Sequence, residues 1–469
     1  MTNPVNEQLL KSRDDPHPTR LALIDKSPPD VPEFSLCPGE QCSWLAQGTS
    51  AGPDKLRPRI EPWLTALCQS EHLSLLLGSG LSHAVRSLCP GGPLAAMTVR
   101  DFGEFDEQIR LAAKKSAAAT GRGEGNIEDQ IRAAADLLRG LEILGTIDKD
   151  AQKKAAVLYK GLTKVLSEFA AAILKGERDV AIADEKNREN AFNYLVSFLM
   201  SFASRTGTRD RLHIFTTNYD RFIEAGAEVA GMHLLDRFVG SLAPVFRSSR
   251  LDLDMHYSPP GIRGEPRYLE GVARFTKLHG SVDWFDCGRS IRRFGVPFGA
   301  EDIAPYLHIP GMQVADAMRL MVYPNASKDR ETADHPYVEL FRDFAAATCR
   351  PNHTLIAYGY SFGDEHINRV IEDMLTIPST HLVIISHGDP LKRIVGLYER
   401  LGRHAQLSLL IGDHLGALKS LVDHYLPKPA IDRTTFRMAE LLKARWQATP
   451  GGDSQTPKEP SAPEGGGDE

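Results

Sequence analysis

The chain has few cysteines, no long apolar run and no large excess of charge of one sign. The six cysteines include no C-x-x-C pair, so a zinc ribbon is not predicted, and a disulfide framework is not expected at this length. No apolar run could span a bilayer, and the N-terminal residues lack the layout of a secretory signal. A formal net charge of −6 gives no whole-molecule attraction to nucleic acid or anionic membranes. We therefore expect a cytoplasmic protein with reduced thiols and no metal, which binds neither membranes nor nucleic acid directly.

The composition is otherwise that of a protein able to bury a sizeable core, with 42% hydrophobic and 25% charged residues. A length of 469 residues suggests about three domains, or one large α/β domain with an insertion. Short apolar runs typical of buried parallel strands recur along the chain, at 73–77, 212–215, 273–278, 354–358, 382–386 and 407–411. Because helical patterns alternate with these runs, we predict an α/β fold, a doubly wound, Rossmann-like parallel sheet with a large helical insertion.

Changes in composition divide the chain into segments. Residues 1–55 are rich in Pro, Gly, Asp and Ser, which predicts a flexible N-terminal arm. Residues 102–206 contain no proline and carry apolar residues at helical spacing. We expect this helical insertion either to cover the active site or to build an oligomer interface. The α/β domain then comprises 56–101 and 207–430, and 431–469 is predicted to form a C-terminal helix and a disordered tail.

A loop with two glycines, Gly78-Ser-Gly-Leu-Ser82, follows the first apolar run. Glycines at a strand-to-helix turn allow the backbone to approach a phosphate, and the helix N-terminus favours the anion. The third glycine of a full dinucleotide-binding fingerprint is missing. An ordinary tight turn between strand and helix is therefore the alternative to phosphate binding.

Polar groups also follow three later apolar runs. The second run ends in Thr216-Thr-Asn-Tyr-Asp220, and two others end in His279-Gly280 and Gly359-Tyr-Ser361. Asn and Asp are good N-cap residues, so capping of the next helix is the alternative for the first of these segments. The carboxyl ends of parallel strands lie along one edge of a sheet, where open α/β sheets bind ligands. We therefore expect these segments and the glycine loop to converge on one crevice.

In this order, the segments resemble the motifs of the sirtuins: a Gly-Ala-Gly-x-Ser loop, Thr-Gln-Asn-x-Asp, a catalytic His-Gly and Gly-Thr/Ser-Ser. The likeness is closer to the sirtuin-like antiphage proteins of bacteria, which share variants of Asn126-Ile-Glu-Asp129 and of Gly-Tyr-Ser-Phe. The resemblance covers roughly residues 70–425.

The resemblance implies a role for each matching residue. Asn218 is expected to orient the attacking water and the nicotinamide ribose, Asp220 to hold the carboxamide, and His279 to act as general base. The implied NAD-binding residues are Gly78, Ser79, Gly80 and Ser82 at the pyrophosphate, Gly359 and Ser361 at the adenosine ribose, Asp389 near the adenine, and Thr216, Thr217 and Tyr219 in the second segment.

Two departures from the sirtuin deacylases bear on the substrate. The deacylase motif Gly-Ile-Pro-Asp-Phe-Arg does not follow Ser82, and the four-cysteine zinc module is reduced to Cys287 and Cys349. The antiphage relatives lack that module and hydrolyse NAD+ itself. The resemblance therefore implies an NAD+ hydrolase that acts in antiphage defence by NAD+ depletion, with NAD+ as substrate and no metal. It also implies a homo-oligomer and a HerA-type hexameric ATPase as partner.

Three other functions remain open on the sequence. A non-catalytic sensor of NAD+ or ADP-ribose and an NAD-dependent protein deacylase are two of them. The third is a serine hydrolase, because Gly359-Tyr-Ser-Phe-Gly363 matches a nucleophile elbow with Ser361 as nucleophile. Its triad would be completed by an aspartate and a histidine in the expected chain order, from Asp389, Asp413, His404 and His414. This alternative leaves the glycine loop without a role.

Overall fold

The structure, a computed structural model, describes residues 7–24, 32–91, 94, 98–119, 124–203, 209–249, 253–257, 267–269, 271–288, 290–307, 320 and 335–428. The chain divides into two compact units, Met1–Pro427 and Lys428–Glu469. Lys428 is the one described residue of the second unit, so the predicted C-terminal helix and tail lie outside the described residues.

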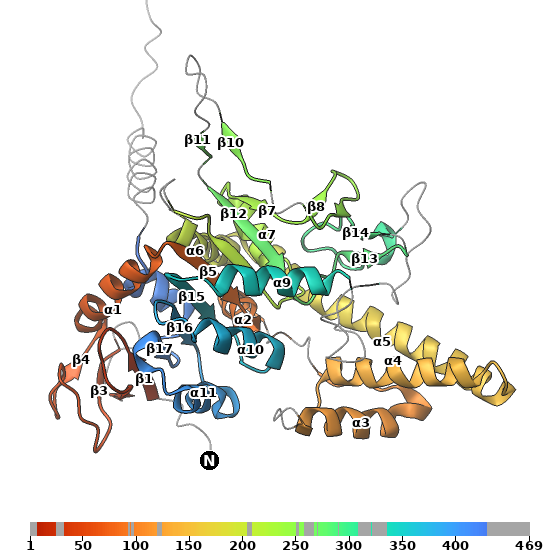
Figure 1. The fold of residues 1–469 in the computed structure, drawn as a ribbon, viewed down its shortest axis with the longest axis horizontal. Coiled ribbons are helices and arrows are strands. Elements are labelled where there is room, and N and C mark those ends of the chain that lie inside the picture. The colour runs from red at the N-terminus through yellow and green to blue at the C-terminus, as the bar shows by residue number, and fades with distance from the viewer. Residues whose placement is uncertain are drawn as a thin grey trace, which may run out of the picture. The chain divides into compact units, whose positions relative to one another are not determined.

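Within the described residues, eleven strands form one sheet in the order β4-β3-β2-β1-β17-β16-β15-β5-β6-β12-β7 (Figure 1). Its parallel part consists of β5 (His72–Leu77), β6 (His213–Thr216), β7 (His233–Leu235), β12 (Val272–Lys277), β15 (His353–Tyr358), β16 (His381–Ser386) and β17 (Leu407–Ile411). β5 comes first in the chain among these strands, yet it lies between β15 and β6. The predicted α/β, Rossmann-like fold is confirmed, and the reversal of strand order at β5 marks the position where such sheets bind ligands.

The sheet is buried on both faces because side chains of its central strands alternate between two hydrophobic cores. Leu75 and Leu77 of β5 belong to one core and Leu76 to the other. The first core includes residues of α1 (Pro53–Cys68), α2 (Ser79–Ser87), α6 (Glu185–Ala203) and α7 (Phe222–Val229), and the second includes residues of α9 (Tyr337–Thr348), α10 (Glu365–Met374) and α11 (Arg393–Leu401). A sheet covered in this way requires continuous apolar runs, and every residue of β15 and β16 is buried.

The predicted helical insertion corresponds to the stretch between α2 and β6. It forms η1 (Gly103–Phe105), α3 (Asp106–Ala119), α4 (Ile127–Leu144), α5 (Lys149–Ala181) and α6. Residues of α3, α4 and α5 share a third core, which includes Leu162 and Phe169 and also residues between 282 and 307, such as Phe285. These helices extend away from the sheet (Figure 1). In α6, by contrast, Leu195 and Phe198 belong to the first core of the sheet. The projecting part is therefore α3–α5, and α6 is one of the helices that cover the sheet.

The described residues between 7 and 51 correct the prediction of a flexible N-terminal arm. They contribute β1 (Glu7–Lys11), β2 (Thr19–Leu23), β3 (Phe34–Leu36) and β4 (Ser50–Ala51), which continue the sheet in antiparallel fashion beyond β17. Leu10, Leu21 and Phe34 are fully buried, and the buried Lys11 Nζ donates to the Leu407 carbonyl at 2.9 Å. The strands are short and lie among Pro, Gly and Asp, so the local pattern indicates a loop, whereas pairing with the edge of β17 determines the structure.

The region between α7 and α9 carries smaller elements. In its described part, an antiparallel sheet has the order β13-β14-β9-β8, from β8 (Phe238–Val239), β9 (Val245–Phe246), β13 (Trp284–Asp286) and β14 (Ile291–Arg293). The remaining described elements are the pair β10 (His256–Tyr257) and β11 (Arg267–Tyr268), the turns η3 (Ala304–Tyr306), η5 (Pro390–Lys392) and η6 (His404–Gln406), and α12 (Leu418–Ser420) with η7 (Leu421–Tyr425). None of the helices in the described ranges combines the length and apolarity needed to cross a membrane.

His381, at the start of β16, gives the fold a specific response to acid. Its ring packs edge-on against Trp63, with ring centroids 5.6 Å apart, and its Nε2 lies 2.8 Å from Ser408 Oγ. Burial lowers the pKa of the His381 imidazole from 6.5 to about 4. The unfolded chain therefore takes up this proton at a higher pH than the folded chain. The contribution of the neutral His381 ring to the free energy of unfolding is therefore fully present above pH 6.5 and is lost as the pH falls toward 4.

We expect His381→Gln to reduce the loss of unfolding free energy between about pH 7.5 and pH 4.5 by about 2–3 kcal/mol relative to the wild type. Urea unfolding at the two pH values measures this difference, and effects common to both proteins cancel. His387→Gln is the matched control, because His387 is exposed and directly follows β16. An equal loss in His381→Gln and in the wild type would contradict the expectation.

Candidate active site

The ends of four parallel strands lie in one row across the sheet. Leu77 of β5 is in register with Tyr358 of β15 on one side and with Thr216 of β6 on the other, and Thr216 is in register with Lys277 of β12. The polar segments that the sequence places after these strands therefore begin at the same edge. A cavity of about 420 Å³ lies there, within the range of about 300–1,000 Å³ typical of small-molecule sites.

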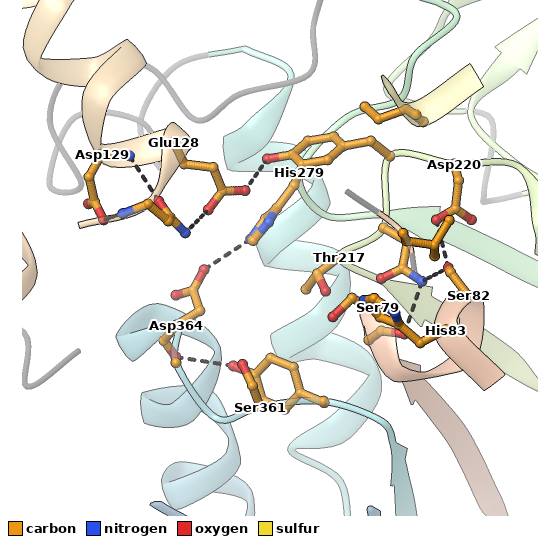
Figure 2. Close-up of a pocket in the computed structure, with 18 of the residues that line it drawn as sticks. Ser79, Ser82, His83, Glu128, Asp129, Thr217, Asp220, His279, Ser361 and Asp364 are labelled. Carbon is orange, nitrogen blue, oxygen red and sulfur yellow. Dashed lines mark hydrogen bonds and ion pairs between the residues drawn. The ribbon is translucent and has the colours of Figure 1, made fainter. Parts of the chain in front are cut away.

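Most of the predicted site residues line this cavity (Figure 2). They come from all four segments: Gly78, Ser79, Ser82, Thr217, Asn218, Tyr219, Asp220, His279 and Ser361. Four other predicted residues, Gly80, Thr216, Gly359 and Asp389, are not among the lining residues. The expected convergence of the segments is thus present, and the contacts below show what the remaining four residues do.

Gly80 and Gly359 bring the first and last segments into direct backbone contact. The Gly80 N–H donates to the Gly359 carbonyl at 3.0 Å. A Cβ on Gly80 would lie 2.5 Å from the Gly359 Cα, and Gly359 has a φ of +60°, which favours glycine. These glycines therefore hold the two loops together. Gly78 and Ser79, at the start of α2, remain at the cavity, where the N-terminus of the helix favours an anion.

Asn218 is fixed by three hydrogen bonds. Its Nδ2 donates to the Gly78 carbonyl at 2.9 Å and to Ser82 Oγ at 3.0 Å, and its backbone N–H donates to Thr216 Oγ1 at 3.0 Å. Thr216 Oγ1 in turn donates to the Leu77 carbonyl at 2.8 Å. The Asn218 side chain is 5% exposed, and its Oδ1 has no hydrogen-bond partner in the described part of the chain. The amide is therefore rigidly held in a residue that lines the cavity, and its oxygen is an acceptor that no described residue satisfies.

Asp220 contacts both the Asn218 network and the start of α7. Its Oδ2 accepts from Ser82 Oγ at 2.6 Å, which links it to the Asn218 network. Its Oδ1 accepts weakly from the Phe222 N–H, at 3.4 Å, in the first turn of α7. The N-cap position of α7 is Arg221, so capping does not account for the placement of Asn218 or Asp220.

A carboxylate orients His279. Its Nε2 lies 2.9 Å from Asp364 Oδ2, while Asp364 Oδ1 accepts the His366 N–H at 2.8 Å as the N-cap of α10 (Figure 2). Tyr360 supports this corner through its hydroxyl, which donates to the Asp364 carbonyl at 3.2 Å. Burial raises the pKa of Tyr360, so this hydroxyl stays protonated and keeps its donor. The arrangement of carboxylate and imidazole is that of a general base held in one orientation.

The helical insertion forms another wall of the cavity through the start of α4. Glu128 Oε1 accepts from the Tyr219 hydroxyl at 2.7 Å, which ties α4 to the segment that carries Asn218. A capping box between Asn126 and Asp129 fixes this end of the helix. Of the two roles expected for the insertion, covering the site is therefore supported by direct contacts (Figure 2).

Many of the lining residues, including several that were not predicted, carry charge. The cations are Arg132 and Arg393. The carboxylates are more numerous: Glu124, Glu128, Asp129, Asp220 and Asp364. The sequence indicated no role for Asp364, Glu128, Arg132 or Arg393. An acidic wall favours a ligand or transition state with positive charge, and the α2 N-terminus with Arg393 offers an anion-binding end. Among the described residues, no group of three or more His, Cys, Asp or Glu is arranged to hold a metal ion.

The serine hydrolase alternative lacks an assembled triad. Ser361 is exposed, and none of the four residues that could complete the triad lines its cavity. Asp389 accepts the N–H groups of Ile394 and Val395, at 2.8 and 3.0 Å, so it caps the start of α11. His414 Nε2 lies 2.8 Å from the Tyr425 hydroxyl. Asp389 therefore has a structural role in the described chain.

Comparison with known proteins agrees with this geometry. Residues 212–400 match the family model described as a SIR2-like domain. The match contains Asn218, His279 and Asp364, and it begins after the glycine loop. No curated protein gave a match. The similarity suggests a sirtuin-like, NAD-related function for this part of the chain.

Proposed function

We propose that this chain is an NAD+ hydrolase, which cleaves the bond between nicotinamide and ribose. The reaction consumes NAD+ and water and yields ADP-ribose, nicotinamide and a proton. The observation that carries the proposal is Asn218, a buried amide of the cavity wall that is held by Thr216, Gly78 and Ser82, and whose Oδ1 has no partner among the described residues. The His279–Asp364 pair lines the same cavity.

The chemistry requires little acid catalysis, because nicotinamide leaves the ribose as a neutral molecule. The transition state has oxocarbenium character, so the sugar carries positive charge as the bond breaks. The carboxylates of the cavity wall are suited to stabilise that charge. What remains is to position the ribose and to activate a water molecule, and both tasks are met by fixed hydrogen-bonding groups.

Each residue then has a defined task. The Asn218 Oδ1 accepts a hydrogen bond from a ribose hydroxyl or from the attacking water. His279, held by Asp364, removes the proton from that water or from a ribose hydroxyl. Asp220 holds the carboxamide of nicotinamide, and the start of α2, with Ser79 and Ser82, receives the pyrophosphate. Ser361 and Arg393, which line the same cavity, face the adenosine half.

Isotope labelling of the products tests the proposal. We expect the purified full-length chain, incubated with NAD+ in H₂¹⁸O, to release equal amounts of nicotinamide and ADP-ribose, with ¹⁸O on the ribose carbon that carried nicotinamide. Addition of an acetyl-lysine peptide should leave these products unchanged. Nicotinamide release that depends on the peptide, with transfer of the acetyl group to ADP-ribose, would instead identify a deacylase. Binding of NAD+ without any release would identify a sensor.

The motif resemblance extends the proposal to antiphage defence by NAD+ depletion, with the chain acting as a homo-oligomer and with a HerA-type hexameric ATPase. Expression of the wild type in bacteria should lower cellular NAD+ on phage infection and restrict phage growth. Cells that express Asn218→Ala should keep their NAD+. Equal phage growth in the two strains would contradict the defence role, whatever the outcome of the labelling experiment.

A further inference from the structure

A second cavity, of about 540 Å³, lies at the β7 edge of the sheet, and it shares no lining residue with the first. It is enclosed by α7, β7 and the segment that follows β14. Much of its wall is apolar, with buried side chains that include Met232, Phe238, Phe275, Phe294 and Val296. The proposed reaction makes no use of this space.

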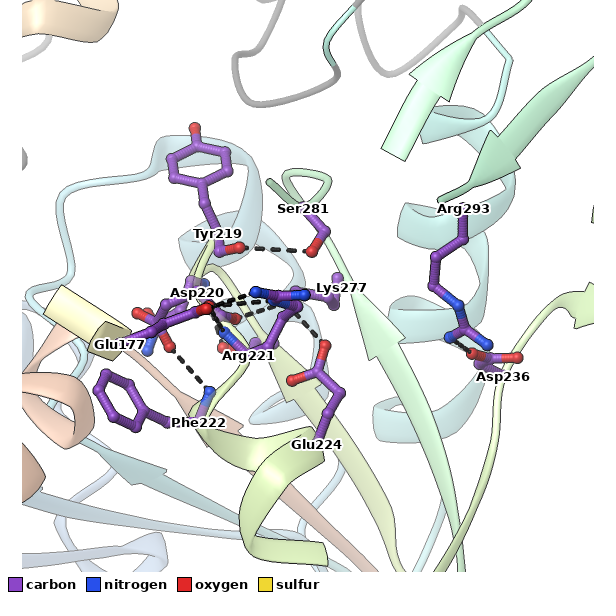
Figure 3. A network of polar contacts seen from close by, with 12 residues as sticks. Glu177, Tyr219, Asp220, Arg221, Phe222, Glu224, Asp236, Lys277, Ser281 and Arg293 are labelled. Carbon is purple, nitrogen blue, oxygen red and sulfur yellow. Dashed lines mark hydrogen bonds and ion pairs between the residues drawn. The ribbon is translucent and has the colours of Figure 1, made fainter. Parts of the chain in front are cut away.

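Several charged side chains line this second cavity. Three ion pairs of the described chain lie here: Arg221 with Glu177, Lys277 with Glu224, and Arg293 with Asp236 (Figure 3). Asp283 lines the cavity as a further carboxylate, and the described residues provide no ion pair for it. Burial raises the pKa of Glu224 and of Asp236, and the charge of Asp283 raises both further. The three ion pairs together with Asp283 contain four carboxylates and three cationic side chains, so carboxylates outnumber cations by one in this cluster.

Two carboxylate oxygens of the cluster lack partners. The Asp283 side chain is 6% exposed, and its Oδ1 accepts no hydrogen bond from any described residue. The same holds for Oε2 of Glu224, whose Oε1 accepts from Lys277 Nζ at 2.8 Å. Withdrawing a carboxylate from water without a partner is unfavourable, so the free oxygens would be stabilised by a cation in the cavity.

We propose that this cavity binds a small organic cation, a primary ammonium group attached to an apolar body. The free oxygens belong to two different carboxylates, and an ammonium group has separate N–H donors that can each serve one carboxylate. The planar fork of a guanidinium matches two oxygens of a single carboxylate instead. Phenylalanine rings and other apolar side chains line the rest of the space, which favours an organic cation over a hydrated inorganic ion.

The position of the cavity connects it with the loop of the first site. Lys277 Nζ donates to the backbone carbonyl of Asp220 as well as to Glu224 (Figure 3). Arg221, which lines the second cavity, directly follows Asp220, which lines the first. The ammonium ligand would therefore bind on the reverse side of the segment that carries Asn218 and Asp220. Its binding does not depend on the reaction proposed for the first site.

Calorimetric titration of the full-length chain with n-hexylamine tests the inference without NAD+. We expect saturable binding of n-hexylamine, which is cationic at neutral pH, and no binding of n-hexanol, its neutral counterpart. Asp283→Asn keeps the shape of the side chain but removes its charge, and it should weaken binding about tenfold or more. Asp286→Asn is the matched control, because Asp286 is exposed on β13, and it should bind like the wild type.

The outcome that would overturn the inference is equal affinity of n-hexylamine for the wild type and Asp283→Asn, or binding of n-hexanol as strong as that of n-hexylamine. Circular dichroism verifies that each variant is folded. If Asp283→Asn does not fold, Glu224→Gln serves in its place, because it removes the charge of the carboxylate to which the other free oxygen belongs. Failure of nicotinamide release in the labelling experiment would leave this result untouched, so the two proposals fail separately.

Discussion

Asn218→Ala is expected to lower the rate of nicotinamide release from NAD+ by at least about 10²-fold. The substitution removes the free Oδ1 acceptor, and it also removes the Nδ2 donor that joins Gly78 to Ser82. Ribose and water would then lose the group that holds them in line for reaction. Chromatographic measurement of nicotinamide over time, at saturating and at low NAD+, gives kcat and KM for both proteins.

Two further variants separate catalysis from folding. Asn190→Ala removes an exposed asparagine of α6 and should release nicotinamide at the wild-type rate. Ser82→Ala removes the hydroxyl that connects Asn218 with Asp220 but keeps the Asn218 amide, so its loss of activity should be smaller. If Asn218→Ala is folded and still releases nicotinamide at the wild-type rate, the role given to Asn218 is wrong.

The strands that carry the site could be predicted because their pattern is local. β15 and β16 contain uninterrupted apolar runs at 355–358 and 382–385, the pattern that burial on both faces of a parallel sheet requires. The convergence of the polar segments followed from the same pattern, because strands in register end at one edge. β1 is different, since its residues form a strand only by pairing with β17, about 400 positions along the chain.

The site residues that the sequence did not reveal depend on contacts between distant segments. Asp364 reads as an ordinary helix N-cap, and it is one, but its second oxygen meets His279, 85 positions earlier. Glu128 lies in a motif whose neighbours form a capping box, and its partner Tyr219 is 91 positions away. A capping signal in the sequence concerns contacts within one turn of helix. It therefore cannot indicate that the second oxygen of Asp364 contacts His279, or that Glu128, beside a capping box, contacts Tyr219.

His279→Ala is expected to lower kcat for nicotinamide release by about 10²–10⁴-fold, the usual contribution of a positioned general base. Asp364 is proposed to act through His279, so Asp364→Asn should lower kcat by a smaller factor and leave KM for NAD+ nearly unchanged. Asparagine is itself a good N-cap residue, so this substitution preserves the start of α10 and changes the group that faces the imidazole. Steady-state kinetics of both variants measure the effects.

A double-mutant cycle shows whether Asp364 acts on the reaction only through His279. In the His279→Ala background, Asp364→Asn should have almost no further effect on kcat, because the imidazole that it orients is already gone. Asp364→Ala is the structural comparison: it also removes the cap of α10, which costs about 0.5–2 kcal/mol of stability that Asp364→Asn should retain. Equal losses of kcat from Asp364→Asn with and without His279 would show that the carboxylate acts independently of the histidine.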